Sequence, residues 1–379
     1  MISVFTNLKY PKITLGNIYL SVKLMIGTYK KKETIITMNS LNYIGSKKSL
    51  IDNIIEVCET NIKPKELKEA VFGDLFAGTG IVGFNFNGLC KQVISNDLEY
   101  FSFVINRGLL KCNYSSKLES IIEELNSLSG VKGLVYKNFS QHKKCERMFF
   151  TPDNAMKCDA IRQRIEKLFD KDKINNNEYY FLLASLIVSV DKVANTSCVY
   201  GAYLKTYKKS ALKEFVVEPI HKNKKLKRNK VYNKDINELV KTTKFDIVYL
   251  DPPYNQRQYG GNYSPLNYIA KYEDVELTGK TGLMKNYNKS EFCSKAKVKN
   301  AFKELIDNID SKHIILSYNN EGLLDVDEMK EILLKRGNVT LHRIKYKKFK
   351  AQKIDDDVKY VYEYLWFVDT RHKYQEIDM

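Results

Sequence analysis

The stretch from residue 71 to residue 83 narrows the possible folds of this chain more than any other segment. An apolar run, Val71–Phe76, passes directly into a turn with glycine at positions 78, 80 and 83. The β-branched and aromatic residues favour a strand, and the G-x-G-x-x-G spacing permits a tight turn into a helix whose N-terminus a ligand can approach closely. The stretch therefore predicts a strand, a glycine turn and a helix in succession, which is the opening unit of an α/β fold.

The same alternation recurs downstream. Val93–Asp97 is predicted as a second strand, and Phe101–Leu110 as the helix after it. Later apolar runs with β-character predict further strands at Phe245–Leu250, His313–Tyr318, Val339–Tyr346 and Tyr360–Val368. Strands that alternate with helices predict an α/β protein with a doubly wound, mostly parallel sheet.

The middle of the chain has a different pattern. Residues 118–128, 155–169 and 178–194 carry apolar side chains at helical spacing, so we expect residues 113–230 to be a mostly helical insertion. The sheet would then be built from 38–112 and 231–379. Residues 1–37 are expected to be an N-terminal extension that is not part of the core, because Met38 directly precedes the first motif and could be the true start.

Charge and cysteine content limit the partner and the compartment. Lys and Arg total 62 against 45 Asp and Glu, a formal net charge of +17 that favours a polyanion such as nucleic acid. The seven cysteines form no Cys-x-x-Cys pair, which predicts reduced thiols in a cytoplasmic protein and no metal site. The longest apolar stretch, residues 179–190, is well short of the roughly 20 residues that cross a bilayer, so we expect a buried helix there and no membrane partner.

The glycine turn is followed by an acid at the end of the second predicted strand, Asp97. A carboxylate in that place can accept hydrogen bonds from both hydroxyls of a ribose. Together, Gly78, Gly80 and Asp97 indicate an adenosine-containing ligand, either a dinucleotide or S-adenosylmethionine. The alternative is an ordinary glycine turn beside a solvated strand-end carboxylate.

A second motif, Asp251-Pro252-Pro253-Tyr254, follows an apolar strand. It places a carboxylate, stiffened backbone carbonyls and an aromatic face at one strand end. An exocyclic amine such as that of adenine needs acceptors for its N–H protons if its nitrogen is to attack a methyl sulfonium, and Asp251 with the Pro252 carbonyl could supply them. Tyr254 could stack on a base extruded from a duplex.

The motifs and their order resemble those of the adenine-N6 DNA methyltransferases of the Dam-like alpha group, and within it the restriction-modification methylases of the FokI and NlaIII type. The resemblance covers roughly residues 40–370. The likeness to the adenine-N6 methyltransferases is carried by Tyr43-Ile-Gly-Ser-Lys47, Asp74-Leu-Phe-Ala-Gly-Thr-Gly80, Asn96-Asp97 and Asp251-Pro-Pro-Tyr254, in that order and with an insertion before the last motif. The likeness to the FokI and NlaIII type is carried by the continuation Asn255–Tyr263 and by Gly279-Lys-Thr-Gly282. It implies a Rossmann-like methyltransferase domain in 38–112 and 231–379, with the target-recognition region in 113–230. It also implies S-adenosylmethionine as cofactor, duplex DNA as substrate and a separate restriction endonuclease as functional partner.

The resemblance further implies a cofactor site and a catalytic site. Asp97 would hold the ribose, and the turn after Asp74 would cradle the methionine end. Asp235 resembles an acid that accepts a hydrogen bond from the cofactor adenine, although an N-cap of the next helix is an equal alternative. The implied cofactor-binding residues are Tyr43, Lys47, Asp74, Phe76, Gly78, Gly80, Asp97, Asp235 and Asp251, and the implied catalytic residues are Asp251, Pro252, Pro253 and Tyr254.

Two groups of residues are candidates for DNA contact. The first follows the catalytic motif and would either line the flipped-base channel or order its own loop; it comprises Arg257, Gln258 and Tyr263. The second lies in the basic run of 221–230 and would either contact phosphates or form a solvated face; it comprises Lys224, Lys225, Lys227 and Arg228. Much of the +17 charge falls in this run and near the C-terminal strands, as in Lys345–Lys350, and this distribution predicts a salt-sensitive basic cleft flanking Asp251.

Other functions remain open from the sequence. A nicotinamide-linked oxidoreductase could use the same glycine turn, but it leaves Asp251–Tyr254 unexplained. A DNA-binding regulator that has lost turnover is a second alternative, and an RNA methylase is the nearest alternative in substrate. Cytosine C5 chemistry is excluded because the chain has no Pro-Cys dipeptide to supply the thiolate.

Overall fold

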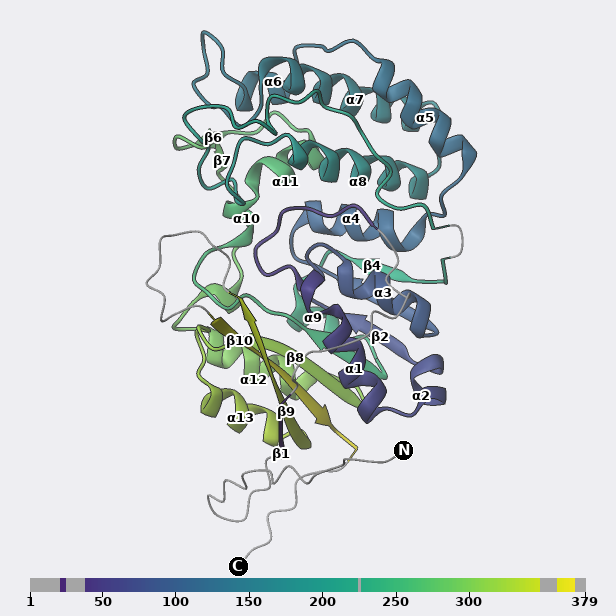
Figure 1. Ribbon diagram of the computed structural model, residues 1–379, viewed down its shortest axis with the longest axis vertical. Helices are drawn as coiled ribbons and strands as arrows, with labels where there is room; N and C mark the ends of the chain where they lie inside the picture. Colours follow the sequence, from purple (N-terminus) through teal and green to yellow (C-terminus); the bar gives the residue numbers. More distant parts are fainter. Residues whose placement is uncertain (1–20, 25–37, 224–225, 348–359, 372–379) are drawn as a thin grey trace, which may run out of the picture.

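The computed structural model describes residues 21–24, 38–223, 226–347 and 360–371, and Figure 1 shows their arrangement. Eight strands form one sheet in the order β1-β9-β10-β8-β5-β2-β3-β4. Their bounds are β1 Ser21–Leu24, β2 Val71–Asp74, β3 Gln92–Asn96, β4 Lys230–Tyr232, β5 Ile247–Leu250, β8 His313–Asn319, β9 Asn338–Lys347 and β10 Tyr360–Asp369.

Most neighbouring strands of this sheet run parallel. β10 is antiparallel to both β8 and β9, whereas β1 with β9, β8 with β5, β5 with β2, β2 with β3 and β3 with β4 are parallel pairs. The predicted α/β class with a doubly wound, mostly parallel sheet is confirmed. Most of the predicted extension, residues 1–20 and 25–37, lies outside the described residues, but 21–24 within it pair with β9 at the sheet edge.

The two sheet faces have separate cores, and β5 shows how the sequence builds them. Ile247 and Tyr249 pack into one hydrophobic cluster, whereas Val248 and Leu250 pack into the other. Because side chains alternate across a strand, a continuous apolar run is what a strand covered on both faces requires.

Helices cover both faces (Figure 1). α9, α12 and α13 supply buried side chains to the cluster of Val248, and α1, α3 and α4 supply them to the cluster of Ile247. The bounds in this part of the molecule are α1 Ile51–Asn61, α2 Pro64–Glu69, α3 Ile81–Leu89, α4 Tyr100–Lys111, α9 Ile236–Val240, α12 Val298–Asn308 and α13 Val326–Leu334, with 3₁₀ turns η1 Lys47–Ser49 and η2 Glu291–Cys293.

A second layer of helices stacks on α4. Gly108 of α4 allows this close packing, because a Cβ there would lie 2.6 Å from the Cβ of Ala184 in α8. We call this second part the helical layer. It contains α5 Ser116–Ser127, α6 Leu134–Phe139, α7 Pro152–Asp170, α8 Asn176–Lys192, α10 Tyr259–Asn262, α11 Ser264–Lys271 and the small hairpin β6 Leu277–Thr278 with β7 Leu283–Met284.

The composition of this layer differs from the predicted insertion of 113–230 in two ways. Residues 259–284, which follow the Asp251 motif, also belong to it, and Lys230 already belongs to the sheet as the first residue of β4. The apolar stretch 179–190 is confirmed as a buried helix, since nearly all its residues in α8 are buried. Among the described residues, no helix is long and apolar enough to cross a membrane.

Candidate active site

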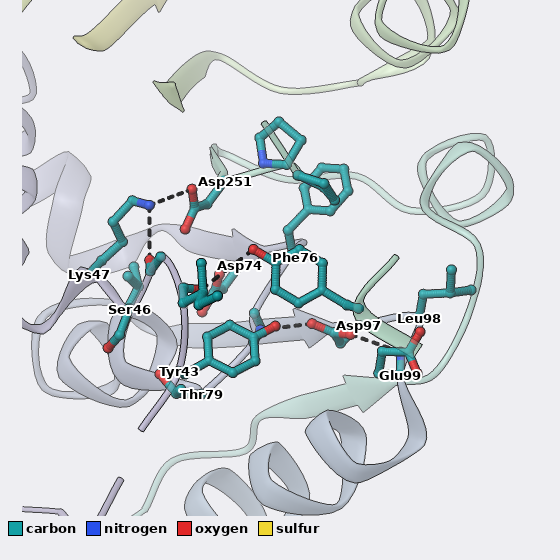
Figure 2. A pocket seen from close by; sticks show the side chains of 18 of the residues that line it. Tyr43, Ser46, Lys47, Asp74, Phe76, Thr79, Asp97, Leu98, Glu99 and Asp251 are labelled. Carbon is teal, nitrogen blue, oxygen red and sulfur yellow. Dashed lines mark hydrogen bonds and ion pairs between the residues drawn. The ribbon is translucent and has the colours of Figure 1, made fainter. Parts of the chain in front are cut away.

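A cavity opens where the carboxyl ends of β2, β3 and β5 meet. These strands are neighbours in the parallel sheet, so the residues that follow them lie at one edge, where α/β proteins bind ligands. Together with the open solvent at its mouth, the cavity has about 800 Å³ of empty space. Its lining includes Tyr43–Lys47, Asp74, Phe76–Thr79, Asp97–Glu99, Asp251–Tyr254, Gln258, Tyr259 and Ser290, several of which are drawn in Figure 2.

The glycine turn forms the floor near β2. Gly78 has φ +49° and Gly80 has φ +75°, the left-handed region that favours glycine. Gly80 is the N-cap of α3, and a Cβ there would lie 2.6 Å from Leu109. Asp74, at the end of β2, accepts a hydrogen bond from the backbone N–H of Gly83 at 2.8 Å and so caps the first turn of α3.

Two acids follow β3. Asp97 accepts hydrogen bonds from the backbone N–H groups of Gly78 at 2.7 Å and Glu99 at 2.8 Å. Glu99 accepts one from the side-chain amide of Asn267 in α11 at 2.6 Å. Both acids line the cavity, so their carboxylates lie at the surface that a ligand would contact.

The segment that carries Tyr43 and Lys47 is held from the helical layer. Asp191, near the end of α8, accepts hydrogen bonds from the backbone N–H of Asn42 at 2.9 Å and from the Tyr200 hydroxyl at 2.8 Å. The hydroxyl of Tyr263 accepts the backbone N–H of Ile44 at 2.9 Å, and its ring stacks on Tyr43 with centroids 4.8 Å apart. The helical layer therefore fixes one wall of the cavity.

An ion pair joins this segment to the strand end of β5. The ammonium of Lys47 lies 2.7 Å from Oδ1 of Asp251, as Figure 2 shows, and 3.4 Å from Oε1 of Glu363 in β10. It also donates to the carbonyl of Gly45 at 3.0 Å. The Lys47 side chain is 6% exposed and that of Asp251 19%, so the pair is shielded from water on the protein side and open on the cavity side.

Burial shifts the pKa values of these groups. It raises the pKa of Asp251 to about 6, with the Lys47 charge opposing the shift and Glu363 adding to it. It raises the pKa of Asp74 to about 7, although the Gly83 N–H favours the carboxylate. Glu99 is likewise raised to a pKa of about 7 by burial. Burial alone would lower the pKa of Lys47. The nearby carboxylates of Asp251 and Glu363 have the larger effect, so the Lys47 pKa lies above its usual value.

The structure brings most of the predicted site residues together and leaves others apart. The residues that line the cavity are Tyr43, Lys47, Asp74, Phe76, Gly78, Asp97, Asp251, Pro252, Pro253, Tyr254 and Gln258. Asp235 is not among the lining residues; its carboxylate caps α9 by accepting the N–H of Asn237 at 2.8 Å, which is the N-cap alternative. Gly80 lies behind the lining as the N-cap of α3.

The candidate DNA contacts divide in the same way. Arg257 is exposed in the loop after Tyr254, whereas Gln258 exchanges hydrogen bonds with the backbone of Ser290 at 3.1 and 2.7 Å. Tyr263 is fully buried, so it orders the Tyr43 segment and cannot contact DNA from where it lies.

The described residues of the basic run, 221–223 and 226–230, do not line the cavity that contains Asp251. Lys227 donates to the carbonyl of Cys90, and the amide of Gln92 donates to the carbonyl of Arg228, both at the start of β3. The cavity lies at the other end of this strand of five residues, roughly 17 Å away at about 3.3 Å per residue. The prediction of a cleft lined by these two side chains beside Asp251 is therefore wrong, and Lys224 and Lys225 lie outside the described residues.

Sequence reasoning missed three acids of this region. Glu99 follows Asp97 by two residues in the same strand-end loop, and this spacing could have found it. Asp191 and Glu363 carried no comparable signal, because each reaches the site through tertiary contacts from a helix end and a distant strand.

Relatives of this chain are methyltransferases of type II systems by their names. It is 45% identical over 317 residues to the type II methyltransferase M.NlaIII of Neisseria lactamica, which covers 83% of this chain and 94% of that protein. It is 42% identical over 337 residues to M.CviAII of Paramecium bursaria Chlorella virus 1, covering 87% and 99%. Against M.FokI of Planomicrobium okeanokoites it is 38% identical over 347 residues, 86% of this chain and 52% of that longer protein.

Among solved structures, a crystal structure of Thermoplasma acidophilum 1320 overlaps 85% of this chain and 89% of that chain at 8% identity, with a TM-score of 0.36. An S-adenosylmethionine-dependent methyltransferase from Clostridium acetobutylicum overlaps 85% and 92% at 9% identity, with a TM-score of 0.30. The sequence relatives confirm the resemblance that the motifs carried. Because the family model matches residues 43–332, the chain belongs to the D12 class N6 adenine-specific DNA methyltransferases.

Proposed function

We propose that Asp251 and the Pro252 carbonyl receive the N6 amine of an adenine flipped out of duplex DNA, and that the chain is the modification enzyme of a type II restriction-modification system. The observation that carries the role of Asp251 is its position: a half-buried carboxylate at the cavity, fixed through Oδ1 by the Lys47 ammonium at 2.7 Å. The type II assignment is supported by the names of the relatives that match nearly their full length.

The cavity suits S-adenosylmethionine, the methyl donor of this enzyme class. Its floor is a glycine turn that admits close approach of a ligand, and its walls supply both aromatic rings and carboxylates. Asp74 and the turn after it would hold the methionine end, and Asp97 the ribose hydroxyls. Phe76 and Tyr43 offer apolar faces to the adenosine, and Asp74, Asp97 and Glu99 provide negative charge that favours a sulfonium cofactor.

The chain's own groups then account for the transfer. The bound cofactor supplies an activated methyl group, so the protein has to orient the amine and stabilise the charge that develops on its nitrogen. Asp251 accepts an N–H of the amine, which draws the nitrogen toward tetrahedral geometry and stabilises its growing positive charge. Tyr254 lines the same cavity from the position three residues later, where its ring can stack on the flipped base.

Substituting Asp251→Asn tests this role, because the amide keeps the shape and loses the charge. We expect methyl transfer to duplex DNA to fall by about 10²-fold or more, as for other groups that stabilise transition-state charge. Binding of S-adenosylmethionine should persist. Asp310→Asn, at an exposed carboxylate that pairs with Lys244, is the matched control. Wild-type transfer rates in Asp251→Asn would overturn the proposal.

The partner and the target sequence require a cellular experiment. We propose that the helical layer and the loop after Tyr254 read the target, and that a separate endonuclease cuts the unmodified site in the same cytoplasm. All seven cysteines are free thiols, which fits a reducing compartment. Sequencing methylated adenines in DNA from cells that express the chain gives the target. An endonuclease encoded nearby should cut that sequence, and only when it is unmethylated; failure to do so contradicts the pairing.

A further inference from the structure

Glu363 is a buried carboxylate beside the proposed catalytic acid. It lies in β10, its side chain is 4% exposed, and its Oε1 is 3.4 Å from the Lys47 ammonium. The hydroxyl of Ser317 in β8 donates to the same oxygen. Ser317 faces Leu365 across the antiparallel pair, so Glu363 and Ser317 share the sheet face that η1 covers. A carboxylate is almost never buried this far unless it is paired, and here its partners are Lys47 and Ser317.

The three protons of the Lys47 ammonium are all accounted for. They face the Gly45 carbonyl, Asp251 and Glu363, at 3.0, 2.7 and 3.4 Å. An ammonium has three donors and no acceptor, so its position is fully determined. It reaches Asp251 through Oδ1 alone, which leaves Oδ2 free of the lysine.

The charges of this group do not cancel. One ammonium faces two carboxylates, so Lys47, Asp251 and Glu363 together carry one net negative charge when both acids are ionised. A simple ion pair of Lys47 with Asp251 would carry none. Because charges interact strongly in a site shielded from water, this difference of one charge acts on whatever the cavity binds.

We propose that Glu363 is a positioning residue that anchors Lys47 against Asp251 and that its charge makes the cavity prefer the cationic cofactor, S-adenosylmethionine, over the neutral product, S-adenosylhomocysteine. The two molecules differ by the methyl group and the positive charge on sulfur. At pH 8 the Glu363 charge adds to the negative charge of Asp74, Asp97 and Glu99 in the same cavity, and each negative charge favours the cation over the neutral product. The inference rests on the proposed role of Asp251 and extends it to product release, because weaker binding of the neutral product frees the enzyme for the next cycle.

The other ionisable groups around the acids do not replace this charge. Asp251 and Glu363 are faced by Lys47 from η1, by Asp74 from β2, by Tyr249 from β5, and by Tyr254 and Tyr259 from the segment after it. The tyrosines are neutral at working pH because burial raises the pKa of each hydroxyl. Lys47 is therefore the one cation of this set.

The test is a pair of variants at one position, measured without DNA so that no turnover occurs. Glu363→Gln keeps an acceptor for Lys47 and Ser317 but removes the charge, whereas Glu363→Asp keeps the charge in a shorter side chain. Calorimetric titration at pH 8 gives the dissociation constants of S-adenosylmethionine and S-adenosylhomocysteine. The preference is the dissociation constant of S-adenosylhomocysteine divided by that of S-adenosylmethionine. We expect Glu363→Gln to lower this ratio by roughly tenfold, and Glu363→Asp to retain it.

A purely structural role would weaken both ligands together and leave the ratio unchanged, and that result would overturn the proposal. Glu331→Gln, at an exposed carboxylate on α13 that pairs with Lys335, is the control for loss of one negative charge. If Glu363→Gln does not fold, Lys47→Met changes the same charge in the opposite direction, because it makes the group one unit more negative at pH 8. The preference for S-adenosylmethionine should then rise above that of the wild type, and an unchanged or lower preference would contradict the inference.

A second readout is the pH profile of methyl transfer. Removing the Glu363 charge lowers the pKa of Asp251, so the acid limb of kcat/KM should move to lower pH in Glu363→Gln. Failure of these tests leaves the role of Asp251 itself intact, because Asp251→Asn is judged by transfer and not by ligand preference.

Discussion

The carboxylate of Asp191, near the end of α8, accepts the backbone N–H of Asn42 at 2.9 Å, and this bond ties the helical layer to the segment that carries Tyr43 and Lys47. The side-chain amide of Asn42 donates to the same oxygen at 3.3 Å. Asp191 is 4% exposed, so water could not easily take the place of its carboxylate as the hydrogen-bond acceptor. The Asp191 side chain therefore connects the helical layer to the cavity wall through hydrogen bonds.

Asp191→Ala should weaken the connection between the helical layer and the segment that carries Tyr43. The substitution leaves the Tyr200 hydroxyl and the Asn42 N–H without their acceptor, and loss of a partner by a buried polar group costs about 1–3 kcal/mol. We expect weaker binding of S-adenosylmethionine and slower methylation, because the Tyr43 wall is no longer fixed. Calorimetry and denaturant titration measure the two effects. Asp170→Ala, at the exposed end of α7, should change neither, and equal behaviour of the two variants would refute a positioning role.

Lys47→Met should move the acid limb of the pH profile. In the wild type, activity that needs ionised Asp251 falls as pH drops through about 6, where the carboxyl binds its proton. The Lys47 charge lowers the Asp251 pKa, so its removal raises that pKa and shifts the limb to higher pH. The rate at the plateau should fall as well, since Asp251 loses its anchor. Lys48→Met changes the adjacent, exposed lysine and should leave the pH profile unchanged. If the acid limb lies at the same pH in the wild type, Lys47→Met and Lys48→Met, the Lys47 charge does not act on the Asp251 pKa.

Gly80→Ala should destabilise the fold, because its φ of +75° disfavours any side chain and a Cβ would meet Leu109 at 2.6 Å and the Asn106 carboxamide at 2.8 Å. Left-handed backbone strain and overpacking together cost about 2 kcal/mol or more. Gly88 lies in the helix that Gly80 caps, and a Cβ added there would have no neighbour within 4 Å, so Gly88→Ala is the matched control and should be neutral or mildly stabilising. Denaturant midpoints for both variants check this, and similar midpoints would contradict the account of the turn.

Arg257→Gln should weaken DNA binding in a salt-dependent way. Arg257 is exposed in the loop between Tyr254 and Gln258, and both of these residues line the cavity. If it contacts one phosphate, its loss lowers affinity several-fold and reduces the slope of log affinity against log salt by about 1. Lys227→Gln removes one positive charge at the opposite end of β3 and should alter neither quantity. A larger effect of Lys227 than of Arg257 would place the DNA on the other edge of the sheet.

The order of the site elements was predictable because the signals are local. A strand that ends in Asp74, a turn that needs glycine at 78 and 80, and a carboxylate after the next strand depend on the conformations of adjacent residues. Parallel strands place their carboxyl ends at one edge, so the strand pattern predicts that Asp74, Asp97 and Asp251 lie at the same edge, and the strand order β5-β2-β3 makes them neighbours there.

The α/β class, the positions of the motifs and the chemistry at the strand ends could thus be read from the order of the amino acids. Long-range packing settles which other residues complete the site and which stay apart from it. Glu363 reaches Lys47 because β10 inserts between β8 and β9, Asp191 reaches Asn42 because α8 packs on α4, and Lys227 is kept away because the basic run leads into β4 at the far end of β3. Strand order and helix packing are set by burial of surfaces distant in the chain, which no local pattern encodes.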